Sequence, residues 1–228
     1  MKSSAEMCYF FILNMWYWIK TNRLIKRIFS NYIWDIPTVE KKVYLTFDDG
    51  PTPEITAWVL KQLKEFDAKA TFFCIGENIQ QYPEIFNSIM QNGHAVGNHT
   101  FNHYNGWQTK TDVYLENCRL CEEAMIPNST IKISNSKLFR PPYGKIKNSQ
   151  AKILLASGYK IIMWDILSAD FDTQVSPEKC LEHVLSHVTQ GSIIVFHDSI
   201  KGFKNLEYAL PKILEFLKEN QYECGEIV

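Results

Sequence analysis

The stretch Thr46-Phe47-Asp48-Asp49-Gly50-Pro51 places two adjacent carboxylates where an apolar run gives way to a turn. The run before them, residues 43–47, consists mostly of strand-forming residues, and Gly-Pro stops a strand. In α/β proteins, the loops after the carboxyl ends of strands are where sites are built. An Asx turn would also explain Asp-Asp-Gly, and for this motif alone it is the favoured interpretation. The polar residues at the other strand ends reverse that preference.

Strand-like and helix-like segments alternate along the chain. Apolar runs predict strands at residues 43–47, 70–75, 95–97, 137–140, 160–164 and 192–196. Helical patterns predict helices near residues 53–66, 83–92, 112–124, 149–157, 177–189 and 206–219. This alternation favours an α/β fold with a mostly parallel sheet, either open and doubly wound or closed into a barrel.

The composition is that of a globular domain. Apolar residues make up 46% of the 228 residues, charged residues make up 21%, and the formal net charge is −1. This length fits one α/β domain with a substantial core, and the charge argues against a nucleic-acid partner. Six cysteines are too sparse for a disulfide framework, and Cys118-x-x-Cys121 lacks a second pair, so we interpret both as helix thiols.

Residues 1–40 differ from the rest because they are apolar and then basic, and we predict that they lie partly outside a folded domain at residues 41–228. The apolar run at 7–19 is short for a transmembrane helix and lacks the cleavage site of a signal peptide. Membrane contact through this segment is a weaker alternative. We expect residues 1–19 to pack poorly against the domain.

Polar residues recur at or just after the carboxyl ends of the predicted strands. They are Asp48 and Asp49 after the first, residues 98–103 after the third, residues 140–144 after the fourth, Asp165 and Asp170 after the fifth, and His197 and Asp198 after the sixth. Polar groups scattered through a core would not recur at the same end of successive strands. The recurrence therefore predicts a site at this edge of the sheet.

His99 and His103 are four residues apart, which on a helical turn would place both imidazoles on one face. Two imidazoles and one carboxylate leave coordination positions open, as a hydrolytic metal requires. Zinc fits such a set best, and cobalt or nickel could also fill it. His183 and His187 share the spacing, but their helix precedes a strand, so we interpret them as structural.

Arg140 precedes two prolines, which exclude a helix and stiffen an extended loop. A preset guanidinium can pair with a carboxylate and favour its ionised form. A surface arginine on a proline loop is the alternative. His197 ends an apolar strand, where a hydrogen-bonded core histidine is the usual outcome, but the other strand-end groups could converge on it.

These motifs resemble the polysaccharide deacetylase family, carbohydrate esterase family four, from about residue 42 to the last residue. The matching blocks are TFDDGP at 46–51, HTFNH at 99–103, RPPYG at 140–144, the block at 164–171, and VFH at 195–197. One block alone is weak, but five in this order are highly specific. The resemblance implies a distorted (β/α) barrel of about seven strands in a single domain, with residues 41–228 as the catalytic domain.

The resemblance also implies a metal-dependent hydrolase that removes acetyl groups from an N-acetylated, GlcNAc-type polysaccharide or oligosaccharide. Asp48 would be the general base that activates a metal-bound water, and Arg140 would orient it. His197 would be the general acid that protonates the amine, with Asp170 as its carboxylate partner. The expected ligands of one divalent metal are Asp49, His99 and His103. The expected substrate-binding residues are Tyr143, Phe171, Val195 and Trp164.

Three positions depart from the family pattern: Phe171 stands where Trp is usual, Leu167 where an Asp is usual, and Val195 where Leu is usual. None removes a catalytic group, but all bear on the substrate. A carbohydrate-binding barrel without catalysis therefore stays open, as does a metal-dependent amidase or esterase acting on O-acetylated xylan or a non-sugar substrate. Family substrates lie in the cell envelope, yet no export signal is evident, so localisation stays open.

Overall fold

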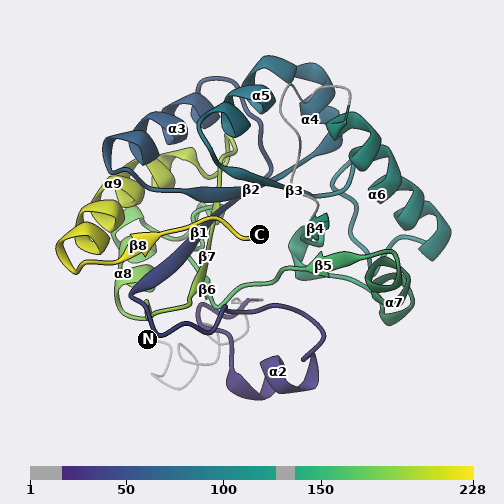
Figure 1. The fold of residues 1–228 in the computed structure, drawn as a ribbon, viewed down its shortest axis with the longest axis horizontal. Helices are drawn as coiled ribbons and strands as arrows, with labels where there is room; N and C mark the ends of the chain where they lie inside the picture. Colours follow the sequence, from purple (N-terminus) through teal and green to yellow (C-terminus); the bar gives the residue numbers. More distant parts are fainter. Residues whose placement is uncertain (1–16, 127–136) are drawn as a thin grey trace, which may run out of the picture.

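The structure, a computed structural model, describes residues 17–126 and 137–228, and seven parallel strands of these residues form one curved sheet (Figure 1). The strand order is β5-β4-β3-β2-β1-β7-β6, and a short strand, β8, pairs with the start of β1. The strands are β1 (Lys42–Asp48), β2 (Ala70–Cys74), β3 (Ala95–Asn98), β4 (Lys137–Phe139), β5 (Tyr159–Ile161), β6 (Ile166–Leu167), β7 (Ile193–His197) and β8 (Glu223–Cys224).

Helices surround the outside of this sheet (Figure 1). They are α2 (Arg23–Ile28), α3 (Ile55–Glu65), α4 (Gly76–Gln81), α5 (Pro83–Gln91), α6 (Thr111–Met125), α7 (Asn148–Ala156), α8 (Pro177–Leu185) and α9 (Phe203–Glu219), with a 3₁₀ turn at Pro142–Gly144. The predicted single-domain barrel of about seven strands is confirmed. All parallel strands point the same way, so their carboxyl ends share one edge, where the site lies.

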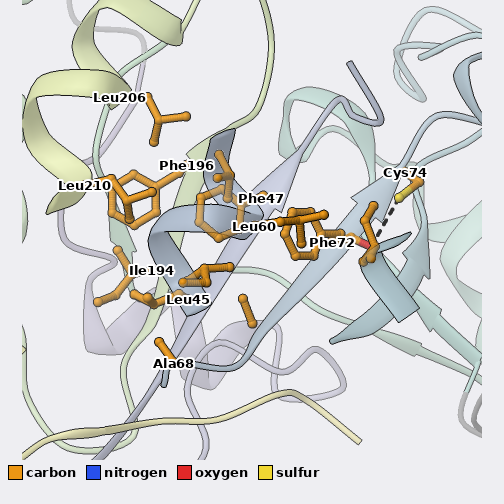
Figure 2. Close-up of a cluster of buried hydrophobic side chains, with 14 of the residues drawn as sticks. Leu45, Phe47, Leu60, Ala68, Phe72, Cys74, Ile194, Phe196, Leu206 and Leu210 are labelled. Carbon is orange, nitrogen blue, oxygen red and sulfur yellow. Dashed lines mark hydrogen bonds between the residues drawn. The ribbon is translucent and has the colours of Figure 1, made fainter. Parts of the chain in front are cut away.

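Side chains of the central strands alternate between two environments. Leu45 and Phe47 face outward into the largest buried cluster, where Phe47 stacks on Phe72 at 5.0 Å and on Phe196 at 5.7 Å between ring centroids (Figure 2). Leu60 of α3 and leucines of α9 cover these rings from outside. Because side chains alternate along a strand, Thr46 and Asp48 face the barrel interior instead.

The N-terminal segment, defined here as residues 17–36, fills the gap between β6 and β5, which are not paired with each other. Ile33 pairs with Ile162 beyond β5, and Lys20 pairs with Ile166 of β6. Figure 1 shows α2 of this segment at that open side. The expectation of poor packing for residues 1–19 falls largely outside the described residues. Of the three described ones, Tyr17 and Ile19 contact the barrel, and Trp18 is exposed. A domain boundary at residue 40 stays a prediction.

The observed elements differ from the predicted ones mainly between β5 and β6. The predicted strand at 160–164 ends early at Ile161, and a separate two-residue strand, β6, starts at Ile166. The sequence analysis also missed the short helices α2 and α4, each of six residues. Within the described residues, no helix is long and apolar enough to cross a membrane. Most of the apolar run at 7–19 lies outside those residues.

Candidate active site

Asp48 and His197 end neighbouring parallel strands and are direct register partners in the sheet. Each is the last residue of its strand, β1 and β7 respectively. Both follow the inward-facing alternation, since Thr46 and Val195 two residues earlier are also register partners. The sheet register therefore brings a carboxylate and an imidazole to one point at the carboxyl edge.

Arg140 lies directly after β4 and is fully buried, with its guanidinium in the barrel interior. Its Nη1 donates to Asp48 Oδ1 at 2.7 Å and to Thr46 Oγ1 at 2.7 Å. Its other nitrogens donate to the carbonyl oxygens of Ile162 and Met163 at 3.2 and 2.9 Å. Burial lowers the pKa of Arg140, while Asp48 opposes that shift. The pair is thus a buried, hydrogen-bonded ion pair that fixes the Asp48 carboxylate.

His197 is held by Asp170, whose carboxylate is completely buried. Asp170 Oδ1 lies 2.8 Å from His197 Nδ1, and Oδ2 accepts the His197 backbone N–H at 2.8 Å. Burial lowers the pKa of His197, but Asp170 outweighs it and raises the pKa to about 9. With Nδ1 engaged, a protonated imidazole directs its Nε2 proton away from Asp170.

Three side chains from two loops gather beside this pair. His103 Nε2 lies 3.1 Å from Asp49 Oδ1, and His99 Nε2 lies 3.6 Å from the same oxygen. One ligand atom from each residue lies within 4.8 Å of the others. Asp49 Oδ1 is buried and has no hydrogen-bond partner among the described residues. A buried, unsatisfied carboxylate oxygen facing two imidazole nitrogens is a donor set that fits a metal ion such as zinc.

The charge states of Asp49 and His99 suit metal binding. Burial raises the pKa of Asp49, but the imidazoles of His103, His197 and His99 outweigh it and hold that pKa well below its usual range. Burial lowers the pKa of His99 to about 4, so its imidazole is neutral and can ligate. His99 Nδ1 is 2.7 Å from the Arg140 carbonyl oxygen, which fixes the ring with Nε2 toward Asp49.

The two histidines converge through a loop, so the helical-turn argument for their spacing was wrong. Residues 99–105 are not helical, and Thr100 and His103 have positive φ values of 64° and 56°. Two backbone donors of this loop, Phe101 and Asn102, bond to the Asn117 side chain on α6 at 2.9 Å. This folded-back loop brings the His99 and His103 ring centroids to 5.1 Å.

Asp198 organises the turn that carries Asp49, a role that the sequence analysis did not assign. Its fully buried carboxylate accepts the Gly50 N–H at 3.1 Å and the Thr56 hydroxyl. A side chain at position 50 would collide with it, because a Cβ there would lie 2.1 Å from Asp198 Oδ2. Burial raises the pKa of Asp198 to about 8. Asn78 of α4 donates to the Asp49 carbonyl at 2.8 Å.

Tyr143 lies in the 3₁₀ turn with φ of 61°, a left-handed conformation that is uncommon for a non-glycine residue. Its ring lies 4.6 Å from that of His103, and the residue is 61% exposed. Within the described part of the chain, its backbone N–H has no hydrogen-bond acceptor. Trp164 packs beneath this turn, because a Cβ on Gly144 would lie 2.5 Å from the Trp164 ring.

Phe171 packs against His197, and Val195 precedes His197 on β7. The Phe171 ring lies 4.9 Å from the His197 ring at an interplanar angle of 66°. Val195 is buried two residues before His197 on β7 and pairs with Leu167 of β6. The loop after β6 is held by Asn205 of α9, whose side chain donates to the carbonyl oxygens of Asp170, Asp172 and Val175. No sequence signal distinguished Asn205 from other helix residues.

Asp165 does not belong to this site, although the sequence analysis grouped it with the strand-end residues. It precedes β6 and lies at the amino end of β7, where its N–H bonds to Ile193 O and its carboxylate to Ser192 Oγ. His183 and His187 are structural, as predicted: their Nδ1 atoms lie 3.0 and 2.9 Å from backbone carbonyl oxygens. Cys118 and Cys121 are buried free thiols on α6, also as predicted.

Several known proteins are similar to this chain in sequence. The family described as polysaccharide deacetylase matches residues 35–162. A peptidoglycan-N-acetylglucosamine deacetylase of Bacillus cereus is 34% identical over 83% of this chain and 87% of its own length.

Solved structures show the same fold. The crystal structure of a peptidoglycan N-acetylglucosamine deacetylase, in complex with 4-naphthalen-1-yl-N-oxidanyl-benzamide, has a TM-score of 0.80 and 31% identity, covering 90% of this chain and 94% of that one. A CE4 family pseudoenzyme from Bacillus anthracis has a TM-score of 0.76 and 25% identity over 86% of this chain and 66% of its own. The chain therefore belongs to the polysaccharide deacetylase family of hydrolases.

Proposed function

We propose that this protein removes the acetyl group from N-acetylglucosamine units of a polysaccharide or oligosaccharide, with residues 41–228 as the catalytic domain. One observation carries the proposal: Asp48 and His197, a fixed carboxylate and a carboxylate-paired imidazole, are register partners beside the Asp49, His99 and His103 cluster. Amide hydrolysis needs a base, an acid and a group that polarises the carbonyl, and this edge supplies all three. The B. cereus relative, a peptidoglycan-N-acetylglucosamine deacetylase, supports the same sugar.

Asp49, His99 and His103 would hold one divalent metal, and their N₂O donor set favours zinc over cobalt or nickel. When bound, the metal would polarise the acetyl carbonyl and make an attacking water more acidic. Asp48 acts as the general base that takes a proton from that water. The buried Arg140 supports this role because its 2.7 Å bond to Asp48 fixes the position of the carboxylate.

His197 acts as the general acid for the amine leaving group. An amine leaves poorly unless it is protonated, and the raised pKa of His197, about 9, keeps the imidazole charged at neutral pH. Asp170 supports this role from Nδ1, leaving Nε2 to deliver the proton. After the reaction, the proton that Asp48 has taken can restore the imidazole.

Substrate contacts are assigned to the residues around the imidazole. The unpaired N–H of Tyr143 would donate to the oxygen that becomes negative in the transition state. Val195 would line the acetyl-methyl pocket, Phe171 would face the sugar ring, and Trp164 would support the Tyr143 turn. The Trp164 position beneath Gly144 supports an indirect role for that residue.

The first competing function is carbohydrate binding without turnover, because the same fold occurs in a pseudoenzyme. The complete set of base, acid, their partners and the three-ligand cluster favours catalysis. The second is a metal-dependent esterase or amidase acting on O-acetylated xylan or a non-sugar substrate. Its catalytic groups would be the same, so only substrates can separate it from N-deacetylation.

The test is acetate release from peptidoglycan, N-acetylated chitooligosaccharides and acetylxylan, before and after chelation and with zinc restored. We expect zinc-dependent release from the first two. Binding of chitooligosaccharide without acetate release from any substrate would favour the non-catalytic barrel. Release from acetylxylan or small esters alone would keep the hydrolase and overturn the N-acetyl assignment.

A further inference from the structure

The rings of Tyr17, Phe171 and His197 lie next to one another in that order, although Tyr17 is distant from the other two in the sequence. The Phe171 ring lies 4.9 Å from His197 and 5.2 Å from Tyr17 of the N-terminal segment, both with edge contacts. Phe171 is thus enclosed from two sides and half-buried. Such edge-to-face contacts each stabilise an aromatic pair beyond the area they bury.

Tyr17 is anchored independently of its ring contact. Its hydroxyl donates to Asp172 Oδ2 at 2.7 Å, and Asp172 adjoins Phe171 in the chain. Burial raises the pKa of Tyr17 and so does Asp172, so the hydroxyl stays a donor. The backbone is fixed two residues later, where Ile19 O accepts the Leu167 N–H of β6 at 2.9 Å. Tyr17 therefore has a fixed position relative to the loop that carries Phe171.

Without Tyr17, one wall of the Phe171 ring would be missing. An aromatic side chain that is free to rotate loses conformational entropy when it stacks on a bound sugar, and this loss weakens binding. A ring already held in place avoids that loss. The family-matched region starts at residue 35, so Tyr17 lies outside it.

We propose that Tyr17 is a positioning residue for substrate: it holds Phe171 in place as the wall of the sugar site beside His197. The N-terminal segment thereby contributes to substrate specificity as well as to closure of the barrel. This inference rests on the proposed function, in which Phe171 faces the sugar.

The kinetic test compares Tyr17→Ala and Tyr17→Phe with Trp18→Ala. Trp18 is the matched control because it is the next residue and is also aromatic, but it is 57% exposed. We expect Tyr17→Ala to raise KM for N-acetylated chitooligosaccharide about 2- to 10-fold, with a smaller loss of kcat/KM on 4-nitrophenyl acetate, which has no sugar ring. Tyr17→Phe should recover most of the loss because it keeps the ring. Trp18→Ala should match the wild type.

A second measurement does not depend on activity. With 4-fluorophenylalanine in place of Phe171, the fluorine resonance should shift and narrow in Tyr17→Ala, because the ring loses a neighbour and rotates faster. An unchanged resonance, or a KM no different from that of Trp18→Ala, would overturn the proposal. Equal losses on the sugar and on the ester would also overturn it. If the wild type released no acetate from any N-acetylglucosamine substrate, the proposed function would fail, while the resonance would still report whether Tyr17 holds Phe171.

Discussion

Two buried aspartates five residues apart, Asp165 and Asp170, lie at opposite ends of the barrel. The carboxylate of Asp165 pairs with lysines, and that of Asp170 pairs with an imidazole. Asp165 binds two lysines of the N-terminal segment, Lys20 and Lys26, each at 2.5 Å. Among the described residues, the Asp170 carboxylate bonds to one residue, His197, through both its imidazole and its backbone N–H. Both carboxylates are almost completely inaccessible.

The partner decides what each buried acid can do. Burial raises the pKa of Asp165, but its lysine and serine partners outweigh this and lower it, so this carboxylate keeps its charge over the physiological range. The partner of Asp170 is an imidazole whose pKa of about 9 allows it to exchange a proton. The Asp165 end of the barrel therefore joins the N-terminal segment to the sheet, and the Asp170 end is suited to proton transfer.

The largest expected effect comes from removing the titratable partner. His197→Ala should lower kcat for acetate release by about 10²–10⁴-fold, the usual contribution of general acid catalysis. The fold should persist because Asp170 still accepts the backbone N–H of residue 197. Steady-state kinetics together with zinc content would test this. Activity within a few-fold of the wild type, at normal metal content, would make another group the acid.

Removing the acid at the other end should affect stability instead. Asp165→Ala leaves Lys20, Lys26 and Ser192 without a shared acceptor, and should lower the free energy of unfolding by about 1–3 kcal/mol. Denaturant unfolding would measure the loss, and kcat of the folded protein should stay the same. Asp35→Ala is the control, since it removes only the more exposed partner of Lys26 and should cost less. A loss of kcat with unchanged stability would contradict the division between the two ends.

The pH profile should separate the two aspartates further. Activity that needs protonated His197 should fall above pH 9, by about tenfold at pH 10. The imidazole stays protonated below its raised pKa of about 9 and loses its proton above it. The stabilising contribution of this pair is complete below the ordinary pKa of 6.5 and is lost as pH rises through about 9. Asp170→Asn should move the basic limb of the profile to lower pH. Asp165→Asn should leave the limb in place, and an equal shift in both variants would refute the assignment.

The smallest effect is expected for one lysine of the pair. Lys20→Met should lower the free energy of unfolding by only about 0.2–1 kcal/mol, because Lys20 is partly exposed and Asp165 keeps Lys26 and Ser192. Thermal melting at low and high salt would detect it. If Lys20→Met lowered the free energy of unfolding as much as Asp165→Ala, the Lys20 contact alone would account for the contribution of Asp165 to stability.

The same comparison shows how far the sequence could predict this molecule. Asp48 and Asp49 were placed correctly because a strand-forming run, two acids and Gly-Pro act locally. Asp165 was misplaced because β6 has only two residues, too few for a periodic signal, so the acid before it seemed to end the preceding strand. Local pattern cannot tell the start of a short strand from the end of a longer one.

Contacts made over long sequence distances were beyond prediction for another reason. Asn205, Asp198 and Tyr17 gain their roles only when α9, the Asp49 turn and the N-terminal segment meet the β6 and β7 loops. The loop that brings His99 and His103 together depends on left-handed residues that are not glycines. Neither hydrophobic periodicity nor turn composition signals such positions.

The closure of the barrel by the N-terminal segment also constrains the order of folding. Lys20 and Asp165 are 145 residues apart, and Tyr17 and Asp172 are 155 apart. During synthesis, the segment leaves the ribosome long before any of these partners exists. The gap between β5 and β6 can therefore be closed only after most of the chain has been made. Long-range contacts of this kind slow folding, so we expect the N-terminal segment to close the gap between β5 and β6 late in folding.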